Sequence, residues 1–229
     1  MAAPIAYEQP TVNSAWRAFL DHLPTLALIL LCQLGVIIVS VLVLVAVCIT
    51  AMLLLGTAAG SLDEPSPIIE MIANIGQFPF TVIINLVGVL FMAVPAMHYE
   101  SGLTITPGMA FGALSRRPAR FLLAGMLFAL VCSIGLLLCV LPGLAVAMVA
   151  PVYVNRIFNT NEPILDAFSR SFQAVYKSEQ GMSFVLTELL AYLAAFVVGC
   201  CTCGLGFLVS GPVSQFYIQN AAYNKGIIS

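Results

Sequence analysis

Three long segments of the chain contain no lysine or arginine, and each has enough apolar sequence to cross a lipid bilayer twice. They cover residues 18–115, 121–155 and 178–224. The eight basic residues lie outside these segments, in short clusters: Arg17; Arg116, Arg117 and Arg120; Arg156, Arg170 and Lys177; and Lys225. Because basic residues accumulate in the cytoplasmic loops of membrane proteins, this spacing predicts a multi-pass topology with every basic cluster on the cytoplasmic side.

Composition supports the same class. Of the 229 residues, 61% are hydrophobic and 8% are charged, and the mean hydropathy is +1.06. Ordinary soluble domains carry about 25% charged residues. Backbone groups inside lipid must be hydrogen-bonded within the membrane-embedded structure, and apolar runs of about 20 residues satisfy that demand as helices. We therefore predict an all-α polytopic bundle and exclude a soluble domain.

Six apolar runs are predicted to form transmembrane helices. They lie near residues 25–55, 78–97, 119–140, 143–158, 182–201 and 204–223. The first run is longer than one upright crossing, so tilt or a protruding end must absorb the excess. The fourth contains Pro151, which favours a kinked or short helix. With six crossings, residues 1–229 form a single membrane domain, and both termini are cytoplasmic.

Three amphipathic helices are expected beside the crossings, near residues 14–23, 107–115 and 163–177. The third shows the clearest helical period: Ile164, Phe168, Phe172 and Val175 recur on one face, and Asp166, Arg170, Gln173 and Lys177 recur on the other. Expected start signals are Asn13 or Ser14, Thr106 with Pro107, and Asn161 with Pro163. Such helices lie at the membrane interface. They either begin three repeated units, each an interfacial helix with a hairpin, or share only a common composition.

A candidate intramembrane polar site consists of Glu188, Asn85 and Tyr192. Glu188 lies about seven residues inside the fifth predicted crossing, where an ionised carboxylate costs several kcal/mol. A functional role would be to bind a cation or proton, or to accept a hydrogen bond from a cofactor or partner. The alternative is a structural role, in which Glu188 pairs with Thr187, Tyr192 or a polar residue of a neighbouring helix.

A second candidate site is a cytoplasmic face for lipid headgroups or a partner. Its residues are Trp16, Arg17, Arg116, Arg117, Arg120, Arg170, Lys177, Gln215 and Gln219. The two glutamines stack at i and i+4 near the end of the last crossing. For that polar end, the alternative is an ordinary interfacial belt of aromatic and amide side chains.

No catalytic motif was found, and no metal site is predicted. The chain has no Gly-rich phosphate loop, no Gly-x-Ser-x-Gly and no His-Glu-x-x-His. His22 and His98 are expected to be interfacial polar anchors. The seven cysteines are expected to be small buried side chains, although Cys139, Cys200, Cys201 and Cys203 would gather at the outer end, where an oxidising compartment permits a disulfide. The protein is therefore predicted not to be an enzyme, and the identity of any cofactor is left open.

The C-terminal half carries a resemblance to known proteins. Its residues are Pro142-Gly143-Leu144, the run from Pro163 to Phe172 (PILDAFSRSF), Gly181, Gly204-Leu205-Gly206 and Pro212. This arrangement resembles a family of uncharacterised bacterial six-helix integral membrane proteins, which is similar to the membrane domain fused to some glycerophosphodiester phosphodiesterases. The resemblance implies a six-helix layout in a bacterial inner membrane or an internal membrane. It transfers no catalytic residue, and this chain contains no phosphodiesterase domain.

Two functional classes are compatible with these observations. The first is a non-catalytic accessory, scaffold or assembly component of a larger membrane complex, or a lipid-organising protein. The second is a small-solute or ion transporter or channel that uses Glu188 and Asn85, and transporters are often built from repeats. The expected partners are membrane lipids, together with other membrane subunits or a second copy of the chain. Nucleic acid is not expected as a partner.

Overall fold

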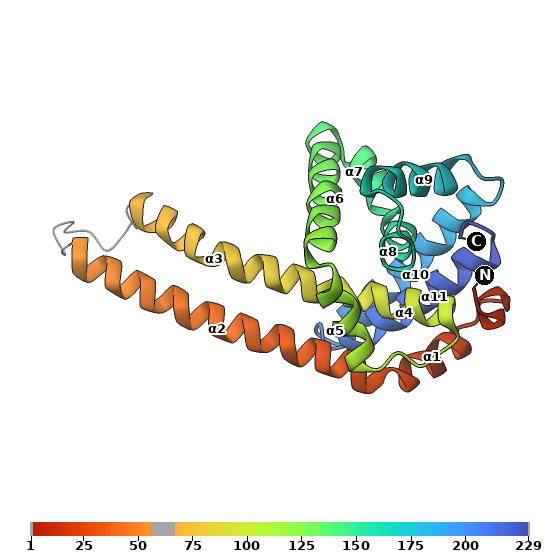
Figure 1. Ribbon diagram of the computed structural model, residues 1–229, viewed down its shortest axis with the longest axis horizontal. Helices are drawn as coiled ribbons and strands as arrows, with labels where there is room; N and C mark the ends of the chain where they lie inside the picture. Colours follow the sequence, from red (N-terminus) through yellow and green to blue (C-terminus); the bar gives the residue numbers. More distant parts are fainter. Residues whose placement is uncertain (1, 56–66, 229) are drawn as a thin grey trace. The chain divides into compact units, whose positions relative to one another are not determined.

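The fold is all-helical over the described part of the chain, which a computed structural model gives as residues 2–55 and 67–228 (Figure 1). In chain order the elements are η1 (Pro4–Tyr7), α1 (Val12–Asp21), α2 (Leu23–Leu55), α3 (Pro67–Gly88), α4 (Leu90–Ser101), α5 (Pro107–Arg116), α6 (Pro118–Leu138), α7 (Val140–Ala147), α8 (Ala150–Asn159), α9 (Ile164–Lys177), α10 (Gly181–Cys201) and α11 (Phe207–Asn224). The all-α prediction is confirmed for these residues.

Five segments of the described chain are long and apolar enough to cross a membrane. They are Leu23–Thr50, Asn74–Ser101, Pro118–Leu138, Val140–Asn159 and Gly181–Cys201. The chain is therefore a multi-pass membrane protein. Helix α11 does not reach the same hydropathy because amide, hydroxyl and tyrosine side chains fill its second half.

The chain forms two compact units, one made of residues 1–27 and 89–229 and the other of residues 28–88. The second unit holds most of α2 and all of α3. There, the Gln33 side chain donates to the Ile84 carbonyl (3.2 Å), and Ser40 pairs with Gln77 further along. The residue numbers in these two pairs rise on one helix as they fall on the other. Residues 28–88 therefore contain an antiparallel α2–α3 hairpin.

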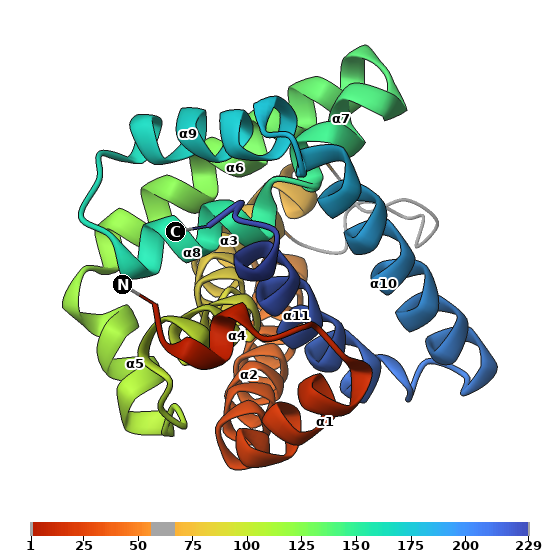
Figure 2. The ribbon, with the colours of Figure 1, turned by 90° about the vertical axis from the view of Figure 1, so that its right-hand side faces the viewer.

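The other unit, called the α11 unit below, is built around its last helix. Helix α11 packs against α10, α1, α4, η1 and α8 (Figure 2). Its fully buried side chains include Phe216, Ile218, Gln219, Ala221 and Ala222. The least apolar of the long helices in this unit therefore occupies the centre of the packing.

Two predicted crossings are interrupted. The second divides at Val89 between α3 and α4, and the fourth divides at Met148 and Val149 between α7 and α8. The expected short or kinked fourth helix is thus present, but the break precedes Pro151, which lies in the first turn of α8. Proline is tolerated at that position because the first turn has no acceptor for its missing N–H.

The three short amphipathic helices occur close to their predicted ranges, as α1, α5 and α9. Thr106 caps α5 as expected, since its hydroxyl accepts from the Met109 N–H. The cap of α1 is different: Thr11 caps the helix, and Ser14 completes a reciprocal capping box at the third helical position. Whether these helices lie at a membrane interface remains a prediction.

The expectation of buried cysteines is wrong. Cys139, Cys200, Cys201 and Cys203 are exposed, and the other three cysteines are half-buried. The exposed four lie at or near helix ends and in the turn between α10 and α11, where few side chains cover them. All seven cysteines lie in the described part of the chain, and none forms a disulfide there.

Candidate functional site

A row of polar side chains follows one face of α11 through the interior of its unit. Gln215, Gln219 and Tyr223 lie four residues apart, so they project from one side of the helix. Gln219 and Tyr223 are fully buried, and Gln215 is 7% exposed. Buried polar groups need hydrogen-bond partners. Gln219 and Tyr223 have them, whereas the surroundings of Gln215 include polar atoms without a partner.

Two members of the row, Gln219 and Tyr223, form hydrogen bonds with other residues of the protein. The buried amide of Asn155 on α8 donates to the Gln219 Oε1 (3.2 Å) and to the Tyr223 hydroxyl (3.0 Å). Gln219 donates to the Pro151 carbonyl (2.8 Å), and Tyr223 donates to Glu100 (2.7 Å). This network joins α11 to α8 and α4.

The remaining member of the row, Gln215, lies in a cluster with Glu188 and Tyr192 of α10, and this cluster contains unpaired acceptors. Glu188 on α10 is completely buried, and neither of its carboxyl oxygens has a hydrogen-bond partner among the described residues. The Tyr192 hydroxyl, one turn further along α10, is close to that carboxyl and accepts a bond from Gln215 Nε2 (3.1 Å). Gln215 Oε1 is also unpaired. The Tyr192 hydroxyl has one hydrogen to donate, toward Glu188, so at least two of these three acceptor atoms lack a donor.

The chemistry of this cluster follows from that imbalance. An ionised carboxylate without a partner is costly inside a bundle, so Glu188 needs a proton, a cation or another donor. The structure brings Glu188 and Tyr192 together as predicted and adds Gln215. Asn85 lies in the α2–α3 hairpin, is exposed, and donates to the Thr81 carbonyl of its own helix (2.8 Å). Its share in this site stays a prediction.

Gln215 and Gln219 occupy a different place from the predicted headgroup or partner face. Both are buried in the α11 unit and bonded to side chains or carbonyls of α10 and α8. The i, i+4 spacing identified their common face correctly. It did not show that other helices cover that face, because sequence spacing alone does not reveal tertiary neighbours.

The two histidines are buried among helices, so they are not exposed anchors; their location near the membrane interface stays a prediction. His22 is fully buried at the end of α1, and its ring centre lies 4.6 Å from that of His98. The Ile105 N–H donates to His22 Nε2 (2.9 Å), so the ring hydrogen is on Nδ1, which donates to the Ala18 carbonyl (2.7 Å). Burial lowers the pKa of His22 below its usual range.

Four arginines surround the segment 160–162, between α8 and α9. Arg117 donates to Asn161 (2.6 Å), and Arg120 donates to the Thr160 carbonyl (3.1 Å). Arg156 and Arg170 both face Glu162, at 3.7 and 2.9 Å. Three of these arginines belong to the predicted headgroup face. The prediction of that face does not include Arg156, which lies within the fourth predicted crossing (143–158).

The other predicted residues of that face do not join this cluster. Trp16, Arg17, Arg116 and Lys177 are exposed. None of the three basic side chains forms an ion pair with a described residue. Trp16 lies beside Phe19 of the same helix, with ring centres 5.5 Å apart.

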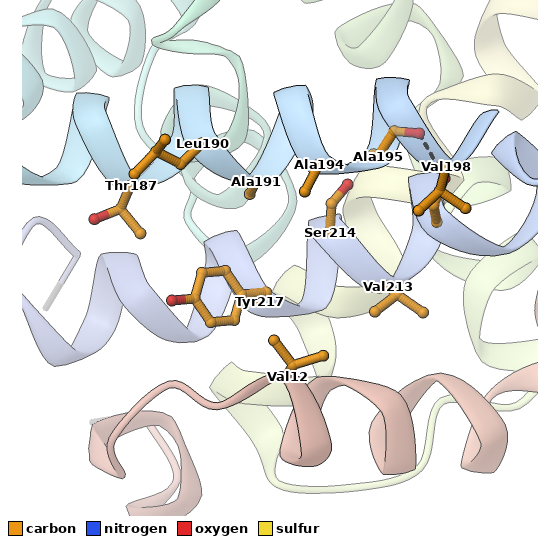
Figure 3. A pocket seen from close by; sticks show the side chains of 11 residues that line it. Val12, Thr187, Leu190, Ala191, Ala194, Ala195, Val198, Val213, Ser214 and Tyr217 are labelled. Atoms are coloured by element: carbon orange, nitrogen blue, oxygen red, sulfur yellow. Dashed lines mark hydrogen bonds between the residues drawn. The ribbon is translucent and has the colours of Figure 1, made fainter. Parts of the chain in front are cut away.

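A groove of about 420 Å³ lies between α10, α11 and the start of α1 (Figure 3). Alanine, valine and leucine side chains form most of its walls, with Thr187, Ser210, Ser214 and Tyr217 as the polar contributors. The Ser210 hydroxyl already donates to the Ala195 carbonyl (3.1 Å). This lining fits an apolar chain better than a polar solute.

Within residues 2–55 and 67–228, no group of three or more His, Cys, Asp or Glu side chains is placed to hold a metal ion. No protein-family model matches this chain, and neither the curated proteins nor the solved structures give a significant match.

Proposed function

We propose that this chain is a non-catalytic component of a larger membrane complex, with an accessory, scaffolding or assembly role. The observation that carries the proposal is the α2–α3 hairpin. Within residues 28–88, the only described side chains that are buried are Ile29, Ser40 and Val87. The exposed ones include large apolar residues of α2 between Leu31 and Ile49, such as Leu31, Ile38, Leu42 and Ile49.

The length of α2 supports a protein partner in addition to lipid. Its 33 residues carry no charge and extend about 50 Å at 1.5 Å per residue. A hydrocarbon core of about 30 Å would cover that length only at a tilt of about 50°, beyond the usual range of 0–40°. A helix of another subunit, or of a second copy, would cover the apolar surface that lipid leaves exposed.

We further propose six crossings, with α11 as the sixth. The amide of Asn220 donates to the Ala6 carbonyl (2.9 Å), and that of Asn224 donates to the Tyr7 carbonyl (3.1 Å). Figure 2 shows the N-terminal segment beside α11. Ends that are bonded together lie on one side of a membrane, which requires an even number of crossings. The basic clusters favour the cytoplasm as that side, and the family resemblance suggests a bacterial inner membrane or an internal membrane.

Site-specific photo-crosslinking in the native membrane tests the component role. A crosslinking residue at Leu42 on α2 (64% exposed) is compared with one at Leu137 on α6 (86% exposed). We expect a discrete protein adduct at Leu42 and only lipid adducts at Leu137. Equal adducts at both positions, or none at Leu42, would contradict the proposal.

Ion or small-solute transport is the second candidate, because Glu188 is a buried carboxyl group without a partner. In proteoliposomes, Glu188→Gln would then abolish flux or proton coupling, whereas Glu179→Gln would not, because Glu179 is exposed. Unchanged flux in Glu188→Gln, or no flux in the wild type, would reject transport through this site. The component role would still be tested separately by crosslinking.

A further inference from the structure

The arginines around residues 160–162 form a cluster with more donors than acceptors. Arg117 and Arg120 come from the start of α6, Arg156 from the last turn of α8, and Arg170 from α9. Glu162 is the only carboxylate that pairs with them among the described residues. Asp166, one turn before Arg170, is exposed and forms no ion pair there. Three positive charges of the cluster are therefore uncompensated.

Unpaired atoms accompany this excess of charge. The Nε atoms of Arg120 and Arg156 are buried and have no acceptor among the described residues, and Glu162 Oε2 has no donor. The side chain of Arg156 is only 19% exposed, so bulk water does not readily replace a missing acceptor. Buried guanidinium groups normally bind carboxylates or phosphates through paired hydrogen bonds.

The cluster lies where two candidate membrane spans reach a membrane surface. The span Pro118–Leu138 begins beside Arg117 and Arg120, and the span Val140–Asn159 ends beside Arg156. Any bilayer crossed by both spans places this cluster at the level of the lipid headgroups. Basic pockets between transmembrane helices at this level bind acidic headgroups.

We propose that the arginine cluster binds the phosphate of an anionic phospholipid such as phosphatidylglycerol. The phosphate oxygens accept from Arg120 and Arg156, and the negative charge offsets part of the excess. This site goes beyond the component role and does not rest on it.

Lipid retention by the purified full chain tests the proposal. Delipidated protein in neutral detergent is equilibrated with equal amounts of phosphatidylglycerol and phosphatidylcholine and repurified, and its bound lipid is measured by mass spectrometry. We expect roughly tenfold preference for phosphatidylglycerol in the wild type. Arg120→Gln and Arg170→Gln should each lower its retention about fivefold, while Arg17→Gln, outside the cluster, should leave it unchanged.

Three results would overturn the proposal. The first is equal retention of the two lipids by the wild type, a result that needs no variant to fold. The second is an equal loss in Arg17→Gln and Arg120→Gln, which would indicate diffuse attraction. The third is displacement of phosphatidylglycerol by an equal concentration of inorganic phosphate, which would identify a soluble phosphate as the ligand. Arg170 is 62% exposed, so its replacement disturbs the fold least.

Discussion

The α11 unit and the α2–α3 hairpin differ in where they place polar and apolar side chains. In the α11 unit the amides of Asn155, Gln219 and Asn220 are buried and bonded to other parts of the chain. In the hairpin, large apolar side chains are exposed, and the bonds between helices come from Gln33, Ser40 and Gln77. The first unit is held together by its own interior. The stability of the hairpin depends more on the lipid or protein that covers its exposed apolar side chains.

A similar contrast exists inside the α11 unit. Gln219 and Glu188 are both fully buried, but Gln219 uses both ends of its amide and Glu188 uses neither oxygen. Gln219 is therefore expected to contribute to the stability of the fold, and Glu188 to reduce it.

The largest expected effect is that of Gln219→Leu. This change leaves the Pro151 carbonyl without its donor and removes an acceptor from Asn155, so the free energy of unfolding should fall by about 3 kcal/mol. Denaturant titration in detergent measures it. Gln173→Leu on the exposed face of α9 is the matched control and should change stability by less than about 0.5 kcal/mol. Equal effects of the two changes would refute the assigned role of the network.

Replacing Glu188 should act in the opposite direction. Glu188→Leu removes a buried carboxyl group that has no partner, and the free energy of unfolding should rise by about 2 kcal/mol. The same titration measures it. A loss of stability comparable to that of Gln219→Leu would show that Glu188 has a structural partner in the folded protein.

Acidification should weaken the α11 unit through His22. Its pKa is lowered by burial, so the unfolded chain binds the proton more readily. The contribution of the neutral His22 ring to the free energy of unfolding is fully present above pH 6.5. It is lost as the pH falls below that value, by at most about 1.4 kcal/mol per pH unit. Asp21 and His98 also face the ring.

Thermal unfolding between pH 7.5 and 5 measures this loss, and His22→Gln isolates it because glutamine retains an acceptor for the Ile105 N–H. An unchanged pH dependence in the variant would exclude His22 as the responsible group.

The smallest expected effect concerns the hairpin. Gln77→Ala removes the pairing with Ser40, whose carbonyl accepts from Gln77 Nε2 (3.0 Å). The hairpin should lose about 1 kcal/mol of local stability. Hydrogen exchange should become faster in α2 and α3 and stay unchanged in α11. Faster exchange in α11 as well would mean that the two units unfold as one.

Much of the fold could be predicted from the sequence, because apolar runs of fixed length and helical periodicity are local signals. The range of α9 and the Thr106 cap of α5 are examples. The break at Val89 has only a weak signal, since Gly88 ends α3 but an isolated glycine is tolerated inside a helical pattern. The burial of the polar face of α11 depends on how it packs against α10 and against α8, whose bonded residues are 64 to 68 positions away.

The candidate site was predicted only in part, because contacts between helices cannot be read from the spacing of residues along one helix. Glu188 was conspicuous as an acidic residue within an apolar run, and Tyr192 follows it by one turn. Gln215 was assigned to a surface, because its partner Tyr192 is 23 residues away. The convergence of Arg156 with Arg117 and Arg120 likewise depends on how α8 packs beside α6, and no spacing rule contains that information.

Native mass measurement after gentle extraction tests the central claim most directly, namely that the exposed hairpin is completed by another membrane helix. The component role predicts a species heavier than one chain and its bound lipid. It also predicts that this species dissociates when Leu42 and Ile38, both exposed on α2, are replaced together by aspartate, while the same change at Leu130 and Leu137 on α6 leaves it intact. A bare monomer from the wild type would contradict the claim.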